Sequence, residues 1–151
     1  METISDTPVQ PVMAPASQIV VNLPLDASVM TMQDGSGSTL YFCDGYTVQV
    51  STLESGDLDK TLRQVTGFGK DQLKLMSSFK GDAKRYDCAW TAAGEGEDQV
   101  CRACILDDGS YHYVVSLMAE ESKAGQLQQN WQDIFVSFRL AAPGEQLNTG
   151  S

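Results

Sequence analysis

The chain has 151 residues, of which 20 are acidic and 10 are basic, and its formal net charge is −10. This length fits a single domain with a real hydrophobic core. The acidic balance argues against nucleic acid and anionic membranes as partners, because both attract a basic face. No apolar run approaches the roughly 18 residues of a membrane span.

The first 18 residues contain Pro8, Pro11 and Pro15 and show no periodic pattern. Proline blocks helix and disfavours sheet, so residues 1–18 are predicted to form a flexible arm. This stretch has neither the basic start nor the apolar centre of a secretion signal. The arm suits a spacer between a membrane anchor and a domain, and an untidy terminus is the alternative.

Strand patterns open the predicted domain, which covers residues 19–140. The candidate strands are Ile19–Leu23, Val29–Met32, Thr39–Cys43 and Tyr46–Leu53. The Gly, Ser and Asp cluster at Gln33–Ser38 predicts a hairpin between the second and third of them. In the fourth, Tyr46, Val48 and Val50 face one side, which is typical of a sheet with unequal faces.

The clearest helix pattern covers residues 55–66. Ser55 or Asp57 can cap its first turn, and Gly67 ends it in the left-handed conformation that glycine favours. Its apolar face consists of Leu58, Leu62 and Val65. The residues that follow, Gln72–Phe79, could form a strand or a helix, and the alternation of Leu73 and Leu75 with polar neighbours favours the strand.

Three further strands are predicted to form an antiparallel meander after a turn at Lys80–Asp82. They are Ala83–Ala92, Gln99–Asp107 and Tyr111–Met118. A two-residue loop at Asp108–Gly109 would set the register of the last two strands. It would place Leu106 opposite Tyr111, Cys104 opposite Tyr113, Arg102 opposite Val115, Ile105 opposite His112 and Ala103 opposite Val114. Both faces are then largely apolar, so we expect a helix on each.

The four cysteines are Cys43, Cys88, Cys101 and Cys104. A symmetric turn around Gly94–Glu95 would set Cys88 opposite Cys101, within reach of a disulfide, and two reduced thiols are the alternative. Cys101 and Cys104 are three apart on one strand and would point to opposite faces, which weakens a redox interpretation. A zinc site made of all four thiols competes with the simpler interpretation of cysteine as a small buried hydrophobe.

The last predicted helix runs from Gln126 to Phe138. Its apolar stripe consists of Leu127, Trp131, Ile134, Phe135 and Phe138. We expect this stripe to pack on the Tyr111–Met118 strand and to form most of the core.

Residues 141–151 are predicted to be a disordered tail. The fold class is therefore α+β, with a central antiparallel sheet of about six strands and helices on both faces, an α/β/α sandwich.

This order of elements resembles the PsbP-like fold. The similar residues are Tyr113–Leu117, then Trp131, Ile134 and Phe135, then Ser137–Arg139, and the resemblance covers roughly Thr39 to Leu140. Relatives with this fold include the photosystem-II extrinsic protein, a Ran-binding nucleotide-release factor and small bacterial lipoproteins. The resemblance implies a central antiparallel sheet with helices on both faces, and it carries no activity, because fold alone does not fix function.

We assign no catalytic, cofactor-binding or metal-binding residue from the sequence, and we expect no cofactor. His112 lies in a strand among aromatic neighbours, where a packing or hydrogen-bonding role is favoured over a catalytic one. Two acidic turns, at residues 95–98 and 107–108, are interpreted as solvated, with weak calcium binding as the alternative. Cys43, at the end of a strand, is the best-placed residue for the competing hypothesis of a cysteine enzyme.

The leading hypothesis is a non-enzymatic binding or scaffold domain, exported and tethered to a bacterial cell surface through residues 1–18. Its partner would be an unknown protein or small ligand, not nucleic acid. Residues 1–151 would not insert into a membrane, and a lipid anchor upstream remains open. A protein-binding surface would use exposed aromatic side chains or the acidic loops. The alternative hypothesis is an acidic cytosolic chaperone that escorts secreted proteins.

Overall fold

A computed structural model describes residues 16–24, 27–31, 38–54, 56–142 and 144–145. Seven antiparallel strands form the main sheet, namely β2 (Ser28–Thr31), β3 (Thr39–Cys43), β4 (Tyr46–Glu54), β5 (Met76–Lys80), β6 (Ala83–Ala92), β7 (Gln99–Asp107) and β8 (Tyr111–Glu120). Their spatial order is β2-β3-β4-β8-β7-β6-β5. The predicted α+β class is confirmed, and the sheet has one strand more than the predicted number of about six.

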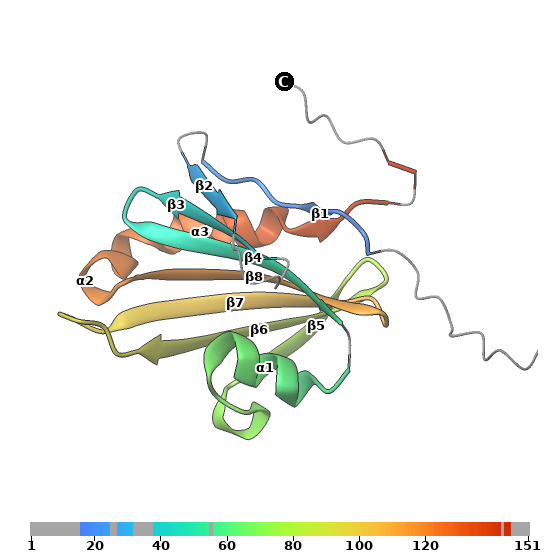
Figure 1. Ribbon diagram of the computed structural model, residues 1–151, viewed down its shortest axis with the longest axis horizontal. Helices are drawn as coiled ribbons and strands as arrows, with labels where there is room; N and C mark the ends of the chain where they lie inside the picture. The colour runs from blue at the N-terminus through green and yellow to red at the C-terminus, as the bar shows by residue number, and fades with distance from the viewer. Residues whose placement is uncertain (1–15, 25–26, 32–37, 55, 143, 146–151) are drawn as a thin grey trace, which may run out of the picture.

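The helices lie on opposite faces of this sheet, as Figure 1 shows for α1 (Leu58–Thr66) and α3 (Gln128–Ser137). A short helix, α2 (Glu121–Ala124), and a 3₁₀ turn, η3 (Gly125–Leu127), connect β8 to α3, and a second 3₁₀ turn, η2 (Lys70–Gln72), follows α1. A separate two-stranded sheet pairs β1 (Ile19–Val20) with β9 (Arg139–Leu140). The predicted arrangement of helices on both faces is therefore confirmed.

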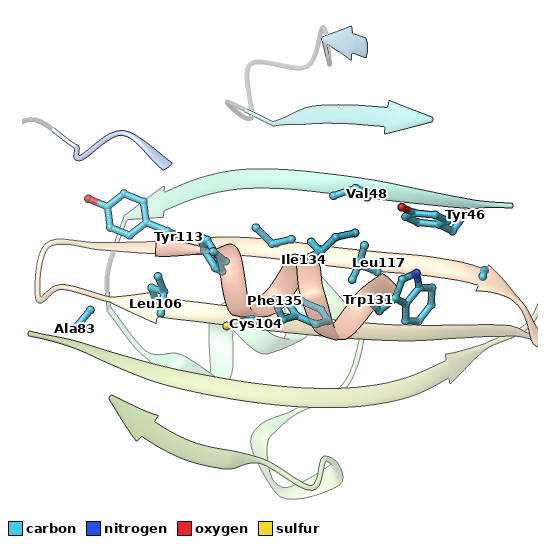
Figure 2. Close-up of a cluster of buried hydrophobic side chains, with 13 residues drawn as sticks. Tyr46, Val48, Ala83, Cys104, Leu106, Tyr113, Leu117, Trp131, Ile134 and Phe135 are labelled. Atoms are coloured by element: carbon cyan, nitrogen blue, oxygen red, sulfur yellow. The ribbon is translucent and has the colours of Figure 1, made fainter. Parts of the chain in front are cut away.

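The larger core lies between the sheet and α3, as predicted from the apolar stripe (Figure 2). Trp131 and Phe138 are fully buried, and Phe135 is almost so. They pack against Tyr113 and Leu117 of β8 and against further side chains of β4, β6 and β7. Burial of each such large apolar side chain contributes about 1.5–3 kcal/mol to stability, so this face supplies much of the hydrophobic driving force.

The smaller core lies under α1. Leu62 is fully buried against Cys88, Ala103, Ile105 and Val114 of the sheet. The Asp57 side chain accepts a hydrogen bond from the Asp59 N–H and is the N-cap, and Gly67 ends the helix with a φ of 84°. The predicted helix and both its caps are confirmed, and Ser55, the other predicted N-cap, lies outside the described residues.

Strand β5 begins later than predicted. The chain enters the strand only at Met76, so Leu73 and Leu75 precede it. Both leucines instead pack against the core under α1. The two leucines alternate with polar residues because the segment that links η2 to β5 turns every second side chain inward. An extended segment can do this without pairing with a neighbouring strand.

The predicted register of the β7–β8 hairpin is wrong by two residues. Leu106 lies opposite Tyr113, Cys104 opposite Val115, Arg102 opposite Leu117, Ile105 opposite Val114 and Ala103 opposite Ser116. His112 lies opposite Asp107, not Ile105. Because side chains alternate with a period of two, a shift of two leaves each of them on its predicted face.

Asp108 explains the shift. Its N–H donates to the Tyr111 carbonyl, so the turn residues are Gly109 and Ser110, with Gly109 at a φ of 93°. The Asp108 carboxylate accepts hydrogen bonds from the N–H groups of Ser110 and Tyr111 and, at 2.8 Å, from the Tyr113 hydroxyl. Asp108 therefore stays outside the turn and stabilises it, whereas the prediction had placed it inside.

The predicted pairing of Cys88 with Cys101 is also wrong. Cys88 lies opposite Ala103, and Cys101 lies opposite Trp90. All four cysteines are free thiols in the structure. Because Ala92 pairs with Gln99, the loop between β6 and β7 is centred on Glu95–Gly96, one residue later than the prediction assumed, and this shifts the partner of Cys88 by two residues along β7. Cys101 and Cys104 do point to opposite faces, as expected from their spacing.

The two ends of the described chain lie together beside α3 (Figure 1). The Ser17 N–H donates to the Tyr113 hydroxyl at 2.9 Å, and the Ala141 N–H donates to the Gln18 carbonyl. Arg139 forms an ion pair of 2.8 Å with Glu145. The predicted flexible arm and tail otherwise fall on residues 1–15, 143 and 146–151, which lie outside the described residues, as do residues 33–37 of the first predicted hairpin loop.

Replacement of Asp108 by alanine is expected to lower the free energy of unfolding by about 1–2 kcal/mol, because the turn loses its capping carboxylate. Burial alone would raise the pKa of Asp108, but the hydrogen bonds from Ser110, Tyr111 and Tyr113 outweigh it and lower the pKa below its ordinary value of 3.8. The stabilisation is therefore complete above pH 3.8 and is lost as the pH falls through the lower folded-state value.

Urea unfolding at neutral pH and at progressively lower pH would measure this effect. The difference between the wild type and Asp108→Ala should shrink below pH 3.8. Asp82→Ala, in the exposed turn between β5 and β6, is the matched control and should change stability little. A difference that persists undiminished in acid would contradict the role assigned to the Asp108 carboxylate.

Candidate functional site

His112 is fully buried and lies between a hydroxyl and a carboxylate. Its Nδ1 is 2.6 Å from Thr61 Oγ1 on α1, and its Nε2 is 3.4 Å from Asp107 Oδ2 on β7. If the Thr61 hydroxyl donates to Nδ1, the proton of the neutral ring lies on Nε2 and faces the carboxylate. In this tautomer Nε2–H faces the Asp107 carboxylate, and among the described residues Nε2 has no hydrogen-bond partner.

The residue types of this array are those of a hydrolytic triad, so the position of the hydroxyl decides its role. Thr61 is only 5% exposed, and its hydroxyl points from α1 inward to the ring. A nucleophile must instead present its oxygen to a substrate carbonyl. The array therefore attaches α1 to the sheet, which agrees with the packing and hydrogen-bonding role expected for His112.

Three carboxylates of the acidic turns have structural partners. Glu97 accepts hydrogen bonds from the N–H and the hydroxyl of Ser122, at 2.6 and 3.0 Å, and so holds the start of α2. Asp107 accepts from the Gly109 N–H, and Asp108 caps the same turn. Among the described residues, no group of three or more His, Cys, Asp or Glu side chains is arranged to hold a metal ion.

The cysteines differ in accessibility. Cys88, Cys101 and Cys104 are buried, and Cys43 is partly exposed at the end of β3. Burial raises the pKa of Cys88 and of Cys101 to about 11 and that of Cys104 to about 12. The thiolate is the reactive form, so the three buried cysteines are poor nucleophiles at neutral pH.

A polar cleft of about 240 Å³ lies between α1 and the neighbouring residues of β4 and β8. It is lined by Ser38, Gln49, Ser51, Leu53, Gln64, Val65, Val114 and Ser116. None of these side chains is charged, and Ser38 and Ser51 already share a hydrogen bond of 2.6 Å. The lining can hold water or a small uncharged molecule, and it contains no group that would perform acid–base chemistry.

Strand β5 forms one edge of the main sheet, and its apolar side chains are exposed. Met76 is 69% exposed and Phe79 is 72% exposed. Phe79 is on the α1 face of the strand, and Met76 is on the α3 face, because Lys80, which has the same parity as Met76, lies opposite the core residue Ala83. Within the described part of the chain, no strand pairs with the outer side of β5.

A second apolar patch lies at the opposite end of the α1 face. Phe42 is 42% exposed, Met118 is 41% exposed, and both lie opposite Thr47 in their respective strand pairs. These side chains have neighbours on both sides within the sheet. Of the two patches, the β5 edge combines greater side-chain exposure with an unpaired backbone, and it is the candidate binding site.

Sequence reasoning expected a protein-binding surface to use exposed aromatic side chains or acidic loops. The structure separates these alternatives, because Glu97, Asp107 and Asp108 are engaged within the fold and Phe79 is not buried. Neither β5 nor its apolar side chains were singled out beforehand. The signal available in the sequence was a strand in which Met76 and Phe79 lie at positions of opposite parity, so that one apolar side chain must point to each face.

Several solved structures share this arrangement. The cyanobacterial PsbP of Synechocystis sp. PCC 6803 matches with a TM-score of 0.60 and 10% identity, over 89% of this chain and 99% of that one. The cell-envelope biogenesis protein LpqN of Mycobacterium tuberculosis matches with a TM-score of 0.53 and 12% identity, over 90% of each chain. The Ran-binding protein Mog1p of Saccharomyces cerevisiae matches with a TM-score of 0.51 and 14% identity, over 81% of this chain and 89% of that one.

The protein thus belongs to the class of α+β domains with an antiparallel sheet between helices. More particularly, it has the PsbP-like fold, as the sequence resemblance implied. No protein-family model and no curated protein sequence matches the chain. A structure from Bacteroides thetaiotaomicron also matches, with a TM-score of 0.57 and 16% identity over 85% of this chain, and the chain spans about half of that protein, 47% of its length.

No helix in the described part of the chain is long and apolar enough to cross a membrane.

Thr61→Val is expected to lower the free energy of unfolding by about 1–3 kcal/mol, because it leaves the buried His112 Nδ1 without its partner. Thermal or urea unfolding would measure the change, with Thr91→Val on the exposed side of β6 as the control. An unchanged stability, accompanied by loss of an ester-hydrolysing activity that the wild type possesses, would instead assign the array to catalysis.

Native alkylation is expected to modify Cys43 first, with Cys88, Cys101 and Cys104 reacting only after unfolding. The reason is that burial both blocks access to these three thiols and raises their pKa values. Intact mass measured against time with iodoacetamide would show one rapid addition, and denaturation would show four. Rapid labelling of a buried thiol, or a mass that reveals a disulfide in protein never exposed to reductant, would contradict this.

Proposed function

We propose that this chain is a non-enzymatic binding domain that recognises another protein through the edge of its sheet at β5. The observation that carries the proposal is the exposure of Met76 and Phe79 on a strand whose outer backbone groups have no partner strand among the described residues. Exposed apolar side chains on a free strand edge invite association, and natural proteins generally cover or blunt such edges.

Strand addition is an established mode of peptide recognition. Backbone hydrogen bonds to the free edge provide affinity, and pockets or side chains beside the edge provide specificity. Strand β5 has five residues, which is a normal length for a strand, and it is anchored to β6 over that whole length. A partner strand would therefore meet a preformed edge.

The fold comparison supports a binding role by analogy. Mog1p is described as a Ran-binding protein, and PsbP and LpqN are other proteins with the same fold. At these identities the likeness carries the fold and no shared partner. A cytosolic chaperone of secreted proteins is not favoured, because the matching structures reported above point to the PsbP-like fold.

We further propose that the domain is exported and held at a cell surface by residues 1–18. The proline content of that stretch and the association of LpqN with cell-envelope biogenesis support this proposal. The cysteines do not add support, because the register separates Cys88 from Cys101. The hydrogen bonds of Ser17 and Gln18 attach the described end of this stretch to the domain beside β9, which is compatible with a tether.

Site-specific photo-crosslinking tests the binding surface. With p-benzoylphenylalanine in place of Phe79, cells of the source organism are expected to yield a discrete crosslinked product, because the side chain at this position is exposed beside the free edge. The same amino acid at Gln132, exposed on α3, is the matched control and should yield none.

Absence of a product at position 79, or the same product at both positions, would contradict a partner at β5. Hydrolysis of any member of a panel of esters, glycosides and peptides by the purified protein would contradict the non-enzymatic part of the proposal.

A further inference from the structure

The free edge of β5 presents defined backbone groups. Lys80 and Ala83 flank the two-residue turn between β5 and β6, and in such a hairpin the flanking residues exchange both backbone hydrogen bonds. The pattern alternates along the strand, so Ser78 and Met76 also bond to β6. Ser77 and Phe79 therefore direct their N–H and C=O groups away from β6, toward the free edge.

The charge around this edge has the opposite sign to that of the molecule. Residues 60–85 contain seven of the ten basic side chains of the chain and only two of its twenty acidic ones. The basic residues are Lys60, Arg63, Lys70, Lys74, Lys80, Lys84 and Arg85, and the acidic ones are Asp71 and Asp82. A chain with a net charge of −10 thus carries a positively charged segment that contains β5.

Three of these cations flank the exposed apolar side chains. Lys74 is two residues before Met76, Lys80 ends the strand, and Lys84 lies opposite Phe79 on β6. Lys80 Nζ donates to the Val136 carbonyl at 3.0 Å, which fixes its stem beside α3. In the described part of the chain, none of these three lysines has a carboxylate within ion-pair distance, in contrast to Arg63 and Arg85.

The nearby carboxylates do not neutralise them. Asp87, opposite Met76, accepts two hydrogen bonds from Arg85 at 2.9 and 3.1 Å. Asp107, opposite Lys84, has one oxygen on the Gly109 N–H and the other facing His112. Asp82, in the exposed turn, is the one acid adjacent to the end of the strand. The edge is left with an excess of positive charge.

A second copy of this chain fits the edge poorly. Antiparallel pairing of β5 with itself about Ser77 would set Lys74 of one copy opposite Lys80 of the other, with Lys84 of each copy one strand away, and like charges across strands destabilise a pair. Lysine on an edge strand is a common protection against such self-pairing. The occupant must instead supply negative charge.

We propose, building on the binding function above, that β5 takes up an extended acidic segment of a partner protein as an eighth strand of the sheet. The segment bonds to the N–H and C=O groups of Ser77 and Phe79. Its apolar side chains pack beside Met76 and Phe79, and its Asp or Glu side chains lie near Lys74, Lys80 and Lys84. Lys74 and Lys80 are six positions apart, so a segment of about six to eight residues spans the site at roughly 3.3 Å per residue.

Two labelled octapeptides provide the probes, one alternating Glu with Val and the other alternating Lys with Val. Fluorescence anisotropy is expected to show at least tenfold tighter binding of the Glu peptide, and its affinity should fall as the ionic strength rises, because surface ion pairs are screened by salt. Amide chemical shifts of the isotopically labelled protein should change most at Ser77 and Phe79.

A backbone variant separates strand addition from simple charge attraction. Ser77→Pro removes an N–H that faces the free edge. The substitution breaks no hydrogen bond between β5 and β6, so the fold should persist. It is expected to weaken binding of the Glu peptide at least tenfold, whereas Ser77→Ala, which keeps the N–H, should bind as the wild type does. Circular dichroism and thermal unfolding check that both variants are folded.

A charge variant provides an independent test if Ser77→Pro fails to fold. Lys84→Glu should weaken binding of the Glu peptide several-fold and reduce its dependence on salt. Lys123→Glu makes the same change on α2, away from β5, and should leave the affinity unchanged. A parallel effect of both variants would mean that net charge alone governs binding, and it would overturn the proposal.

Several other results would also overturn it. The first is equal binding of the two peptides, or failure of the Glu peptide to bind, and the second is an identical affinity of Ser77→Pro and Ser77→Ala for that peptide. The third is a set of amide chemical-shift changes centred on Phe42 and Met118 or on the polar cleft. The fourth is a concentration dependence of the β5 chemical shifts without peptide, which would indicate a second copy. A crosslinked partner at position 79 that is insensitive to Ser77→Pro would retain the binding function and reject the acidic strand. Absence of that crosslink would reject the binding function itself.

Discussion

Strand β8 is buried on both of its faces, and the rest of the structure depends on this double burial. Tyr113, Val115 and Leu117 face α3, and His112 and Val114 face α1. A strand in this position must be central, because only a central strand has neighbours on both sides as well as covers on both faces. It pairs with β4 on one side and β7 on the other. Each helix is then required to cover the apolar side chains that this arrangement leaves.

The double burial also explains the polar contacts of His112 beside the smaller core. A histidine ring enclosed under α1 needs hydrogen-bonding partners, since an unpaired polar group in a low-dielectric interior is costly. Thr61 supplies one from the helix and Asp107 supplies a carboxylate from the neighbouring strand. The same three residues therefore fix the position of α1 along the sheet. The apolar contacts of Leu58, Leu62 and Val65 are interchangeable and do not fix that position.

Most elements of the fold were predictable from local patterns, and their pairing was less so. The bounds of β6 and β7 follow from apolar alternation between turn residues, and α1 follows from its caps. The register of β7 and β8 does not follow from local patterns. It depends on which backbone N–H groups donate to the Asp108 carboxylate. Both turn positions for Asp108 are compatible with the local sequence. The hydroxyl of Tyr113, which selects one of them, becomes a neighbour only after the strands pair.

The candidate site was less predictable still, because exposure at β5 is a consequence of sheet order. Nothing local distinguishes Met76 and Phe79 from side chains of a central strand. Their exposure arises because β5 is last in the order and because α1, with Leu73 and Leu75, covers the sheet only as far as Tyr86 and Trp90. The acidic turns, by contrast, stand out in the sequence, and three of their carboxylates, Glu97, Asp107 and Asp108, are engaged within the fold.

The lysines around β5 have two effects, because they oppose aggregation through the edge and favour recognition of an acidic partner. A free edge flanked by apolar side chains would pair readily with a second copy, and positive charge at the edge opposes this. The same charge does not oppose an acidic strand, because the sign of the interaction is reversed while the backbone hydrogen bonds are the same. In a chain that is otherwise strongly acidic, three lysines at this edge therefore discriminate between partners by charge at little cost to the fold. Specificity of this kind resides in surface residues, so it can differ completely among proteins that share the PsbP-like fold.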